Sequence, residues 1–296
     1  MSSFSDFKNR SRNNISNLTQ KLEDMNKKDS YKDDRFWRPE LDKSSNGFAV
    51  IRFLPAAGEE DLPWAKYYSH GFQGSGGWYI ENSRTTFGEK DPVSEMNSKL
   101  WNSGSEKDKD IARSRRRKTN YVANIYVVSD PANPQNEGKI FLYRFGQKIF
   151  NKIQEAMQPE FQDEQPVNPF DFWTGADFKL KIRRVSGYIN YDKSEFSSPS
   201  ALFDGDDAKL EELWKKEYPL SEFTDPAKYK SYDELKAKLQ TVIGDDIRAV
   251  IDQKPATVET VEVETPVSKS EDANDSSTEV EESDALTYFE KLAAED

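Results

Sequence analysis

Alternating apolar and polar positions along the chain predict a core that is mainly β. Residues 121–129 (YVANIYVVS) give the clearest strand, and residues 176–185 alternate between apolar and basic side chains. The same pattern predicts further strands at 47–55, 64–72, 77–82 and 139–145, and helices at 146–157, 206–217 and 231–243. Several short strands with a few helices favour a small antiparallel barrel with appended elements.

Two stretches between these elements lack a periodic pattern. Residues 73–77 (QGSGG) are glycine-rich, but no Lys-Ser/Thr pair follows and no helix begins there. They therefore predict a hairpin connection rather than a phosphate-binding loop. Residues 83–118 are long and polar, with Trp101 isolated among them, and they predict a loop-rich subdomain.

The two ends of the chain differ from the core. In residues 1–28, Ile15, Leu18 and Leu22 have helical spacing and follow a basic group, which predicts an N-terminal arm. The group consists of Lys8, Arg10 and Arg12. Residues 252–296 are rich in Glu, Ser, Thr and Asp, so we expect a disordered acidic tail. The core is then residues 29–251.

The net charge of −12 is distributed very unevenly. Residues 252–296 hold fourteen acidic and three basic residues, a net charge of −11, so residues 1–251 carry only −1. Within the core, residues 113–118 (RSRRRK) place five cations in six positions. Cations this close repel one another unless an anion neutralises them. The acidic composition therefore does not exclude a nucleic acid as partner.

Motifs for catalysis are missing from the sequence. The chain has no cysteine and a single histidine, His70, so a disulfide framework or a thiolate site is excluded. The sequence contains no Gly-x-Ser-x-Gly, no phosphate-binding loop and no dinucleotide fingerprint. It also has no long apolar run and no signal-peptide pattern, so we expect an intracellular protein without a membrane partner. The sequence does not predict an enzyme.

Binding to single-stranded nucleic acid is better supported. Cations and aromatic residues alternate in Tyr143-Arg144-Phe145, and Arg183 and Arg184 precede Tyr188. Unpaired bases stack on aromatic rings, which contributes roughly 1–3 kcal/mol per base, while Lys and Arg neutralise phosphates. These interactions suit DNA and RNA alike. A single-stranded RNA-binding translational regulator, or a metal-dependent enzyme acting on nucleic acid through Asp and Glu, remains an alternative.

Several blocks of the core resemble one family. They are NGFAVIRFLP at 46–55, GWYIE at 77–81, DPANPQNEG at 130–138, YRFG at 143–146 and VSGYINY at 185–191. In this order they resemble the gene 32 single-stranded DNA-binding proteins, or helix-destabilising proteins, of T-even-like phages. The resemblance runs through about residues 40–245.

The resemblance implies an OB-fold core that coats single-stranded DNA cooperatively during replication, recombination and repair, in the cytoplasm of the infected bacterium. It implies that the arm binds a neighbouring copy through a basic motif, here Lys8, Arg10, Ser11 and Arg12. It also implies that the tail contacts replication and recombination proteins. Leu286, Phe289 and Leu292 have helical spacing there and predict a partner-binding element.

The residue pattern and the resemblance together give one set of candidate residues for single-stranded DNA. The set is Arg115, Arg116, Arg117, Lys118, Tyr121, Tyr143, Arg144, Arg183, Arg184, Tyr188, Tyr191 and Trp101. Where the family tends to place a second aromatic residue directly after the one matched by Tyr121, this chain has Val122.

The resemblance also raises the question of a metal. The family's best-known member binds zinc through one histidine and three cysteines. Here His70 is retained, but the cysteine positions fall in residues 82–94, which contain no sulfur. We therefore predict no metal and no other cofactor in this chain.

Overall fold

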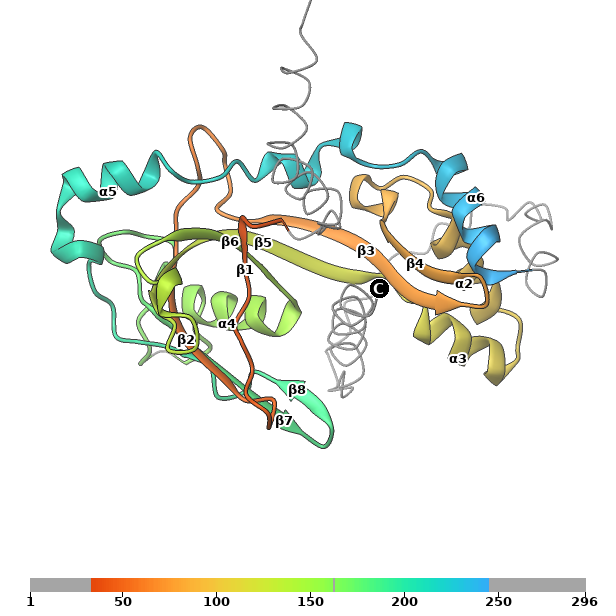
Figure 1. The fold of residues 1–296 in the computed structure, drawn as a ribbon, viewed down its shortest axis with the longest axis horizontal. Helices are drawn as coiled ribbons and strands as arrows, with labels where there is room; N and C mark the ends of the chain where they lie inside the picture. The colour runs from red at the N-terminus through yellow and green to blue at the C-terminus, as the bar shows by residue number, and fades with distance from the viewer. Residues whose placement is uncertain (1–32, 162, 245–296) are drawn as a thin grey trace, which may run out of the picture. The chain divides into compact units, whose positions relative to one another are not determined.

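The computed structural model describes residues 33–161 and 163–244 (Figure 1). The predicted arm and tail, with the residues named in them, lie outside this part of the chain. The strands are β1 (Phe36–Trp37), β2 (Gly47–Phe53), β3 (Ala65–Gly74), β4 (Gly77–Asn82), β5 (Lys118–Ser129), β6 (Ile140–Phe145), β7 (Phe178–Val185), β8 (Tyr188–Asn190) and β9 (Glu195–Phe196). The α-helices are α2 (Pro92–Trp101), α3 (Glu106–Ser114), α4 (Gln147–Met157), α5 (Asp207–Trp214) and α6 (Tyr232–Ile243). The 3-10 helices are η1 (Arg84–Phe87), η2 (Pro134–Asn136), η3 (Leu202–Gly205), η4 (Ser221–Thr224) and η5 (Pro226–Lys228).

The strands form one mixed sheet, so the fold is mainly β and of the α+β class. Its main path runs β1-β6-β5-β2-β7-β8, while β3 pairs with both β4 and β5, and β9 pairs with β7. All pairs are antiparallel except β1 with β6. The predicted strands and the three predicted helices are confirmed, with small shifts of their ends. No helix in the described residues is long and apolar enough to cross a membrane.

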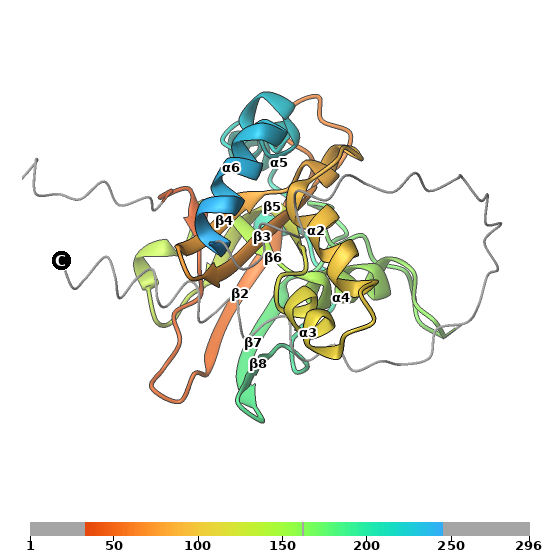
Figure 2. The same ribbon diagram turned by 90° about the vertical axis from the view of Figure 1, so that its right-hand side faces the viewer.

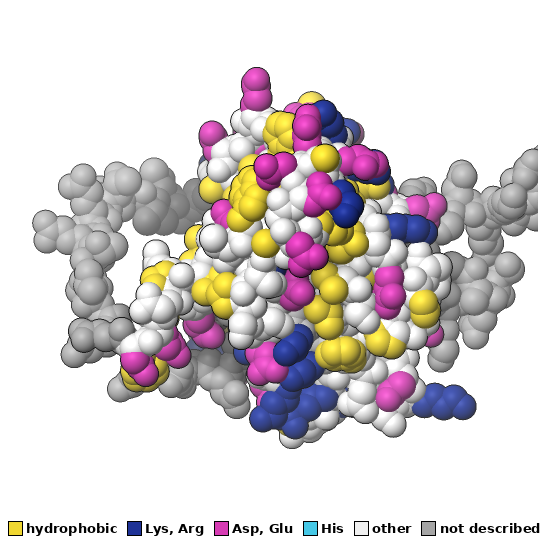
Figure 3. Space-filling view, turned by 90° about the vertical axis from the view of Figure 1, so that its left-hand side faces the viewer, with side chains coloured by type: hydrophobic (Ala, Val, Ile, Leu, Met, Phe, Trp, Pro, Cys, Tyr) yellow, Lys and Arg dark blue, Asp and Glu magenta, His cyan; other side chains and the backbone are white. Residues whose placement is uncertain are grey.

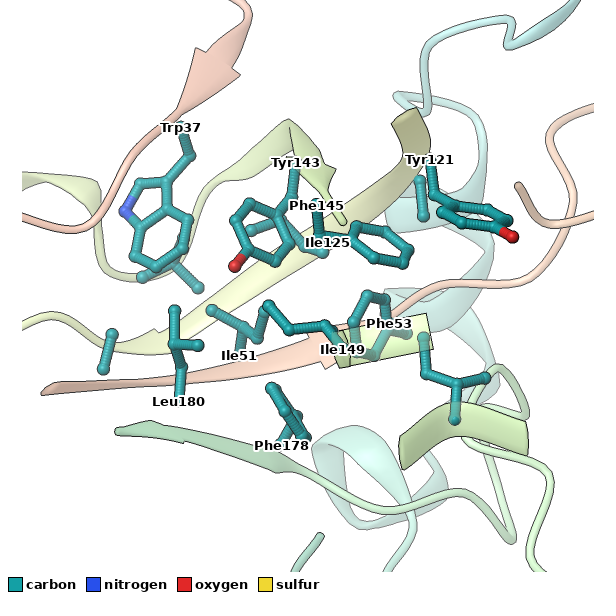
Figure 4. Packing of buried hydrophobic residues seen from close by; sticks show 14 of the residues in the cluster. Trp37, Ile51, Phe53, Tyr121, Ile125, Tyr143, Phe145, Ile149, Phe178 and Leu180 are labelled. Atoms are coloured by element: carbon teal, nitrogen blue, oxygen red, sulfur yellow. The ribbon is translucent and has the colours of Figure 1, made fainter. Parts of the chain in front are cut away.

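A first group of buried side chains, the main cluster, fills the inner face of the sheet (Figure 4). Alternation in β2 turns Ala49, Ile51 and Phe53 inward, and each is fully buried. They pack against β5, β6 and β7 and against α4, which contributes Ile149 and Ile153. Burying these apolar surfaces stabilises the sheet and fixes where α4 lies.

A second group, the helical cluster, lies at the far ends of β3 and β4 (Figure 2). There Phe72 stacks on Tyr79, with ring centroids 5.1 Å apart. Side chains of α2, α3 and α6 surround this pair. The glycine-rich connection is a hairpin turn, as predicted, and the Gly76 amide donates to the Val242 carbonyl at 2.7 Å. A Cβ at Gly76 would lie 2.0 Å from the carbonyl oxygen of Thr241, which explains the glycine.

The prediction of a loop-rich subdomain at 83–118 is wrong, because α2 and α3 lie within it. Asp91 caps α2 by accepting from the amides of Val93 and Ser94, and Pro92 occupies the first turn. Val93, Met96 and Leu100 then recur at helical spacing and are buried. The many charged residues between these apolar positions concealed the helical period in the sequence.

Candidate nucleic-acid interface

Among the described residues, the inner face of the sheet is partly exposed between the two clusters. β3 and β5 run from the main cluster to the helical cluster (Figure 1). In β3, alternation places Lys66, Tyr68, His70 and Phe72 on one face. Phe72 and His70 are buried at the helical end, whereas Tyr68 is partly exposed and Lys66 is exposed. We call Lys66, Tyr68 and Arg117 the β3–β5 strip.

The strip joins cations to an aromatic ring. The guanidinium carbon of Arg117 lies 4.0 Å from the centroid of the Tyr68 ring. The Lys66 ammonium lies 5.7 Å from the same centroid and 5.7 Å from that of Tyr121, which is its register partner across the β3–β5 ladder. These are cation–π distances. A phosphate and a base arriving here would find two positive charges beside one partly exposed ring.

The cations of the strip have no carboxylate partner within the described residues. Neither Lys66 nor Arg117 makes a salt bridge there, and both side chains are exposed. Arg113, at the start of the same basic run, instead contacts Asp110 and Glu106. Charge at Lys66 and Arg117 is therefore available for an external anion, while charge at Arg113 is partly neutralised within α3.

The basic run divides into buried and exposed residues. Arg116 and Arg117 are exposed, as expected for contact with phosphates. The guanidinium of Arg115 instead lies over the Phe72 ring, and burial lowers the pKa of Arg115 below its ordinary value. Lys118 is only 7% exposed. Lys118 is therefore not displayed to solvent, and Arg115 is half-buried against the helical cluster, so neither presents its charge as openly as Arg116 and Arg117 do.

Two of the predicted stacking residues belong to the main cluster (Figure 4). Tyr121 is 2% exposed and stacks on Phe150 of α4, with centroids 3.9 Å apart and planes at 8°. Its hydroxyl donates to Gln147 at 3.0 Å. Tyr143 is 4% exposed and packs edge-on against Trp37. The prediction that these rings present stacking faces is corrected, since each face is already covered by protein.

Arg144 lies on the other face of the sheet. Its register partner in β5 is Val122, whereas the flanking Tyr143 and Phe145 pair with Ala123 and Tyr121. Because neighbouring side chains along a strand point to opposite faces, Arg144 is separated from the β3–β5 strip by the sheet itself. The prediction grouped it with Tyr143 because the two are adjacent in sequence.

The β7–β8 hairpin carries the remaining predicted cations. Figure 3 shows Lys and Arg side chains gathered at the lower end of one face, the end where Figure 1 places the tips of β7 and β8. Arg184 is exposed and makes no salt bridge within the described residues, whereas Arg183 is held by Asp192. Tyr188 is 39% exposed at the tip, opposite Val185, and Tyr191 packs partly against the main cluster.

Trp101 ends α2 with its ring 49% exposed, and the guanidinium carbon of Arg113 lies 5.3 Å from the ring centroid. The predicted residues thus fall into separate groups. Arg117 belongs to the strip with Arg116 exposed next to it in sequence, Arg184 and Tyr188 form the hairpin tip, and Trp101 lies at the end of α2.

Comparison with known proteins places the sequence of this chain in a family. The sequence model of a family described as "gp32 DNA binding protein like" matches residues 45–243, which is more than half of the chain. The chain belongs to this gp32-like DNA-binding family. The single-stranded DNA-binding protein of Enterobacteria phage T4 is 44% identical over 225 residues, covering 74% of this chain and 73% of that protein. The protein of the same name from Enterobacteria phage T2 is 44% identical over 214 residues, or 70% of each chain.

The surroundings of His70 do not fit the zinc site that the family resemblance implies. Within the described residues, no group of three or more His, Cys, Asp or Glu side chains converges on one point. Glu81, the register partner of His70, is paired with Lys230 and Lys238. The other acidic neighbour, Asp91, already accepts from the amides of Val93, Ser94 and Arg84 and from the Ser83 hydroxyl. Zinc usually takes four ligands, at about 2.0–2.3 Å. One imidazole and a carboxylate committed to four donors do not supply such a set.

Two residues of the strip, Lys66 and Tyr68, were not among the predicted site residues. The predicted strand at 64–72 contains both, and Lys66 and Tyr68 share one face of it. A cation beside an aromatic ring on one strand face was therefore a usable signal. The sequence pattern alone did not show that this part of the face stays uncovered.

Proposed function

We propose that this chain is a non-enzymatic protein that binds single-stranded DNA and coats it cooperatively. The observation that carries the proposal is the β3–β5 strip, where Lys66 and Arg117 flank Tyr68 without a carboxylate partner in the described residues. The family membership and the names of the relatives support the same function.

In this proposal the strip holds one base and the phosphates beside it. The base stacks on Tyr68, while Lys66, Arg116 and Arg117 neutralise the backbone. The hairpin tip, with Arg184 and Tyr188, and the exposed Trp101 provide further contacts along the strand. A duplex buries the faces of its bases in its own stack, so the strip favours single strands.

The wider roles follow from the family resemblance. We propose that the core is an OB-type barrel and that the protein acts during replication, recombination and repair in the infected cell. The arm, through Lys8, Arg10, Ser11 and Arg12, joins neighbouring copies on DNA. The acidic tail, through Leu286, Phe289 and Leu292, recruits replication and recombination proteins. These residues lie outside the described part of the chain.

A titration of the full chain tests the proposal. A fluorescein-labelled oligo(dT) of about 12 nucleotides, within the usual range of one OB-type site, is followed by anisotropy at several salt concentrations. We expect affinity to fall steeply with salt, because binding releases counterions from the strand. A matched hairpin duplex should bind far more weakly. Equal affinity for the duplex, or an affinity that does not depend on salt, contradicts the proposal.

The RNA-binding alternative is tested in the same assay with oligo(U) of equal length. Clear preference for oligo(U) favours the translational-regulator alternative over DNA coating. Incubating the protein with magnesium and labelled strands tests the enzyme alternative, since a coat protein leaves the strands intact.

A further inference from the structure

A carbonyl in the middle of the basic run is held from two sides. The Arg115 carbonyl oxygen accepts from the Asn97 side chain of α2 at 2.9 Å and lies 3.2 Å from Nδ1 of His70 on β3. Arg115 is the C-cap of α3, so this carbonyl lies past the last turn of the helix. Helix ends need such partners for their last carbonyls. Here the two partners come from α2 and β3. They fix the position of the backbone directly before Arg116 and Arg117.

His70 is itself held by Asp91. The imidazole Nε2 lies 3.3 Å from Oδ1 of Asp91, in an orientation that does not make a hydrogen bond. Both side chains are 1% exposed. One ring nitrogen therefore faces a carbonyl and the other faces a carboxylate, and both of these are acceptors.

Asp91 is anchored in turn by the start of α2. Burial alone would raise the pKa of Asp91, but the contact with His70 and the bonds from Ser94 and Ser83 outweigh it and lower the pKa. The carboxylate thus stays ionised opposite the imidazole. A continuous chain of contacts runs from the N-terminus of α2 through Asp91 and His70 to the Arg115 carbonyl.

We propose that His70 and Asp91 are positioning residues for DNA binding, which hold the basic run so that Arg116 and Arg117 are presented to phosphate. The inference rests on the proposed function. These contacts hold the basic run without a metal, at the place where the family resemblance implies a zinc ion. An arginine on a fixed backbone loses less conformational entropy on binding a phosphate than one on a mobile loop. The affinity for DNA should therefore depend on the contacts of His70 and Asp91.

Substitutions at His70 test the inference through DNA binding. His70→Leu removes both contacts, and we expect about a fivefold loss of oligo(dT) affinity from the ordering of released side chains. His70→Asn keeps a donor near the position of Nδ1 and should restore part of that loss. In an Arg116→Gln/Arg117→Gln background, His70→Leu should have little further effect. Equal losses in both backgrounds would show a general structural role and overturn the inference.

A matched control separates positioning from stability. Val242→Ala also weakens the helical cluster, in which Val242 is 3% exposed, but Val242 is not part of the chain from Asp91 to Arg115. We expect it to lower the melting temperature while oligo(dT) affinity is kept. An affinity loss equal to that of His70→Leu contradicts the inference. If His70→Leu does not fold, His70→Asn takes its place: we expect a partial loss of oligo(dT) affinity, and an affinity equal to that of the wild type contradicts the inference.

A second measurement needs no DNA, so its failure is distinct from a failure of the proposed function. Trypsin cleaves after Arg and Lys, and a held segment resists it. We expect mass spectrometry to show faster cleavage within 113–118 in His70→Leu than in the wild type or Val242→Ala. Unchanged cleavage there overturns the inference. A chelator should leave the cleavage rate and the melting temperature of the wild type unchanged. Stoichiometric zinc in the purified protein, whose removal speeds cleavage, would contradict a basic run that is held without a metal.

Discussion

The guanidinium of Arg117 lies over the ring of Tyr68, with its central carbon 4.0 Å from the ring centroid. Tyr68 lies in β3, and Arg117 directly precedes β5, the antiparallel partner of β3, in which Thr119 is the register partner of Tyr68. This contact holds an arginine without a carboxylate partner in the described residues beside a partly exposed ring. The pair thus offers a positive charge for a phosphate and an aromatic ring for a base of single-stranded DNA.

Tyr68 should make a direct contribution to binding. We expect Tyr68→Ala to weaken oligo(dT) binding about tenfold through loss of base stacking, and Tyr68→Phe to bind nearly as well as the wild type. Anisotropy titration at fixed salt measures both. Trp173→Ala is the control, because this ring is 53% exposed in the loop before β7 and is not part of the strip. Equal losses for Tyr68→Ala and Trp173→Ala would contradict a specific stacking role.

Lys66 and Arg117 should appear in the salt dependence of binding. Each phosphate neutralised on a single strand adds about 0.7 to the slope of log affinity against log salt. We therefore expect Lys66→Gln and Arg117→Gln each to reduce the slope by about 0.7. Lys209→Gln is the control, since Lys209 on α5 faces Asp206. A slope that stays at the wild-type value in both strip variants would exclude them from phosphate contact.

Asp192 should compete with DNA for Arg183. The bond from Arg183 lowers the pKa of Asp192 and raises that of Arg183, so both groups stay charged at neutral pH. We expect Asp192→Asn to raise oligo(dT) affinity about twofold at low salt, because an exposed ion pair is weak and its loss releases a cation. Raising the salt concentration should remove the gain. An unchanged affinity for Asp192→Asn at low salt, or a gain that persists with Arg183→Gln, contradicts this role.

Glu217 should make stability fall as pH rises. Burial and the nearby Glu60 carboxylate raise the pKa of Glu217 to about 8, and neither carboxylate oxygen has a hydrogen-bond partner within the described residues. Its pKa in an unfolded chain is about 4.3. Between these values the folded protein holds a proton that the unfolded chain has released. The resulting stability is complete below about pH 4 and is lost as pH rises through 8.

Glu217→Gln tests this expectation, because it keeps the shape and removes the charge. At pH 8 the variant should melt higher than the wild type by about 5 °C, and the difference should shrink towards pH 5. Glu212→Gln is the control, since Glu212 is exposed beside Lys216. A difference between Glu217→Gln and the wild type that does not vary with pH would contradict a buried, protonated Glu217.

Local pattern was sufficient for most elements but not for all. Alternation located β7, which buries one face, and a run of β-forming residues located β5, which is buried on both faces. The helix α6 followed from apolar residues at helical spacing. The signals for α2 were also present, in the cap at Asp91, Pro92 in the first turn and the spacing of Val93, Met96 and Leu100. The prediction of a loop at 83–118 relied on the polarity of this stretch and gave too little weight to the cap and the apolar spacing of α2.

The candidate interface shows why a residue list from sequence was incomplete. Tyr68 and Tyr121 are both tyrosines on the same sheet face, and Lys66 lies at 5.7 Å from each ring. Phe150 of α4 covers Tyr121, whereas Tyr68 falls in the interval that neither cluster covers. The local composition and spacing do not distinguish a buried ring from a partly exposed one. Sequence reasoning therefore selected Tyr121 and missed Tyr68.

The sequence by itself determined the class of ligand, the strands and the place of the basic run. It did so because charge, aromatic content and alternation are local properties of the chain. Only the tertiary structure decided which cations are displayed. Arg115 lies half-buried over the Phe72 ring and Arg144 lies on the other face of the sheet, whereas Arg117 is exposed beside Tyr68. Exposure depends on which distant elements pack against a face, and that packing is a property of the whole fold.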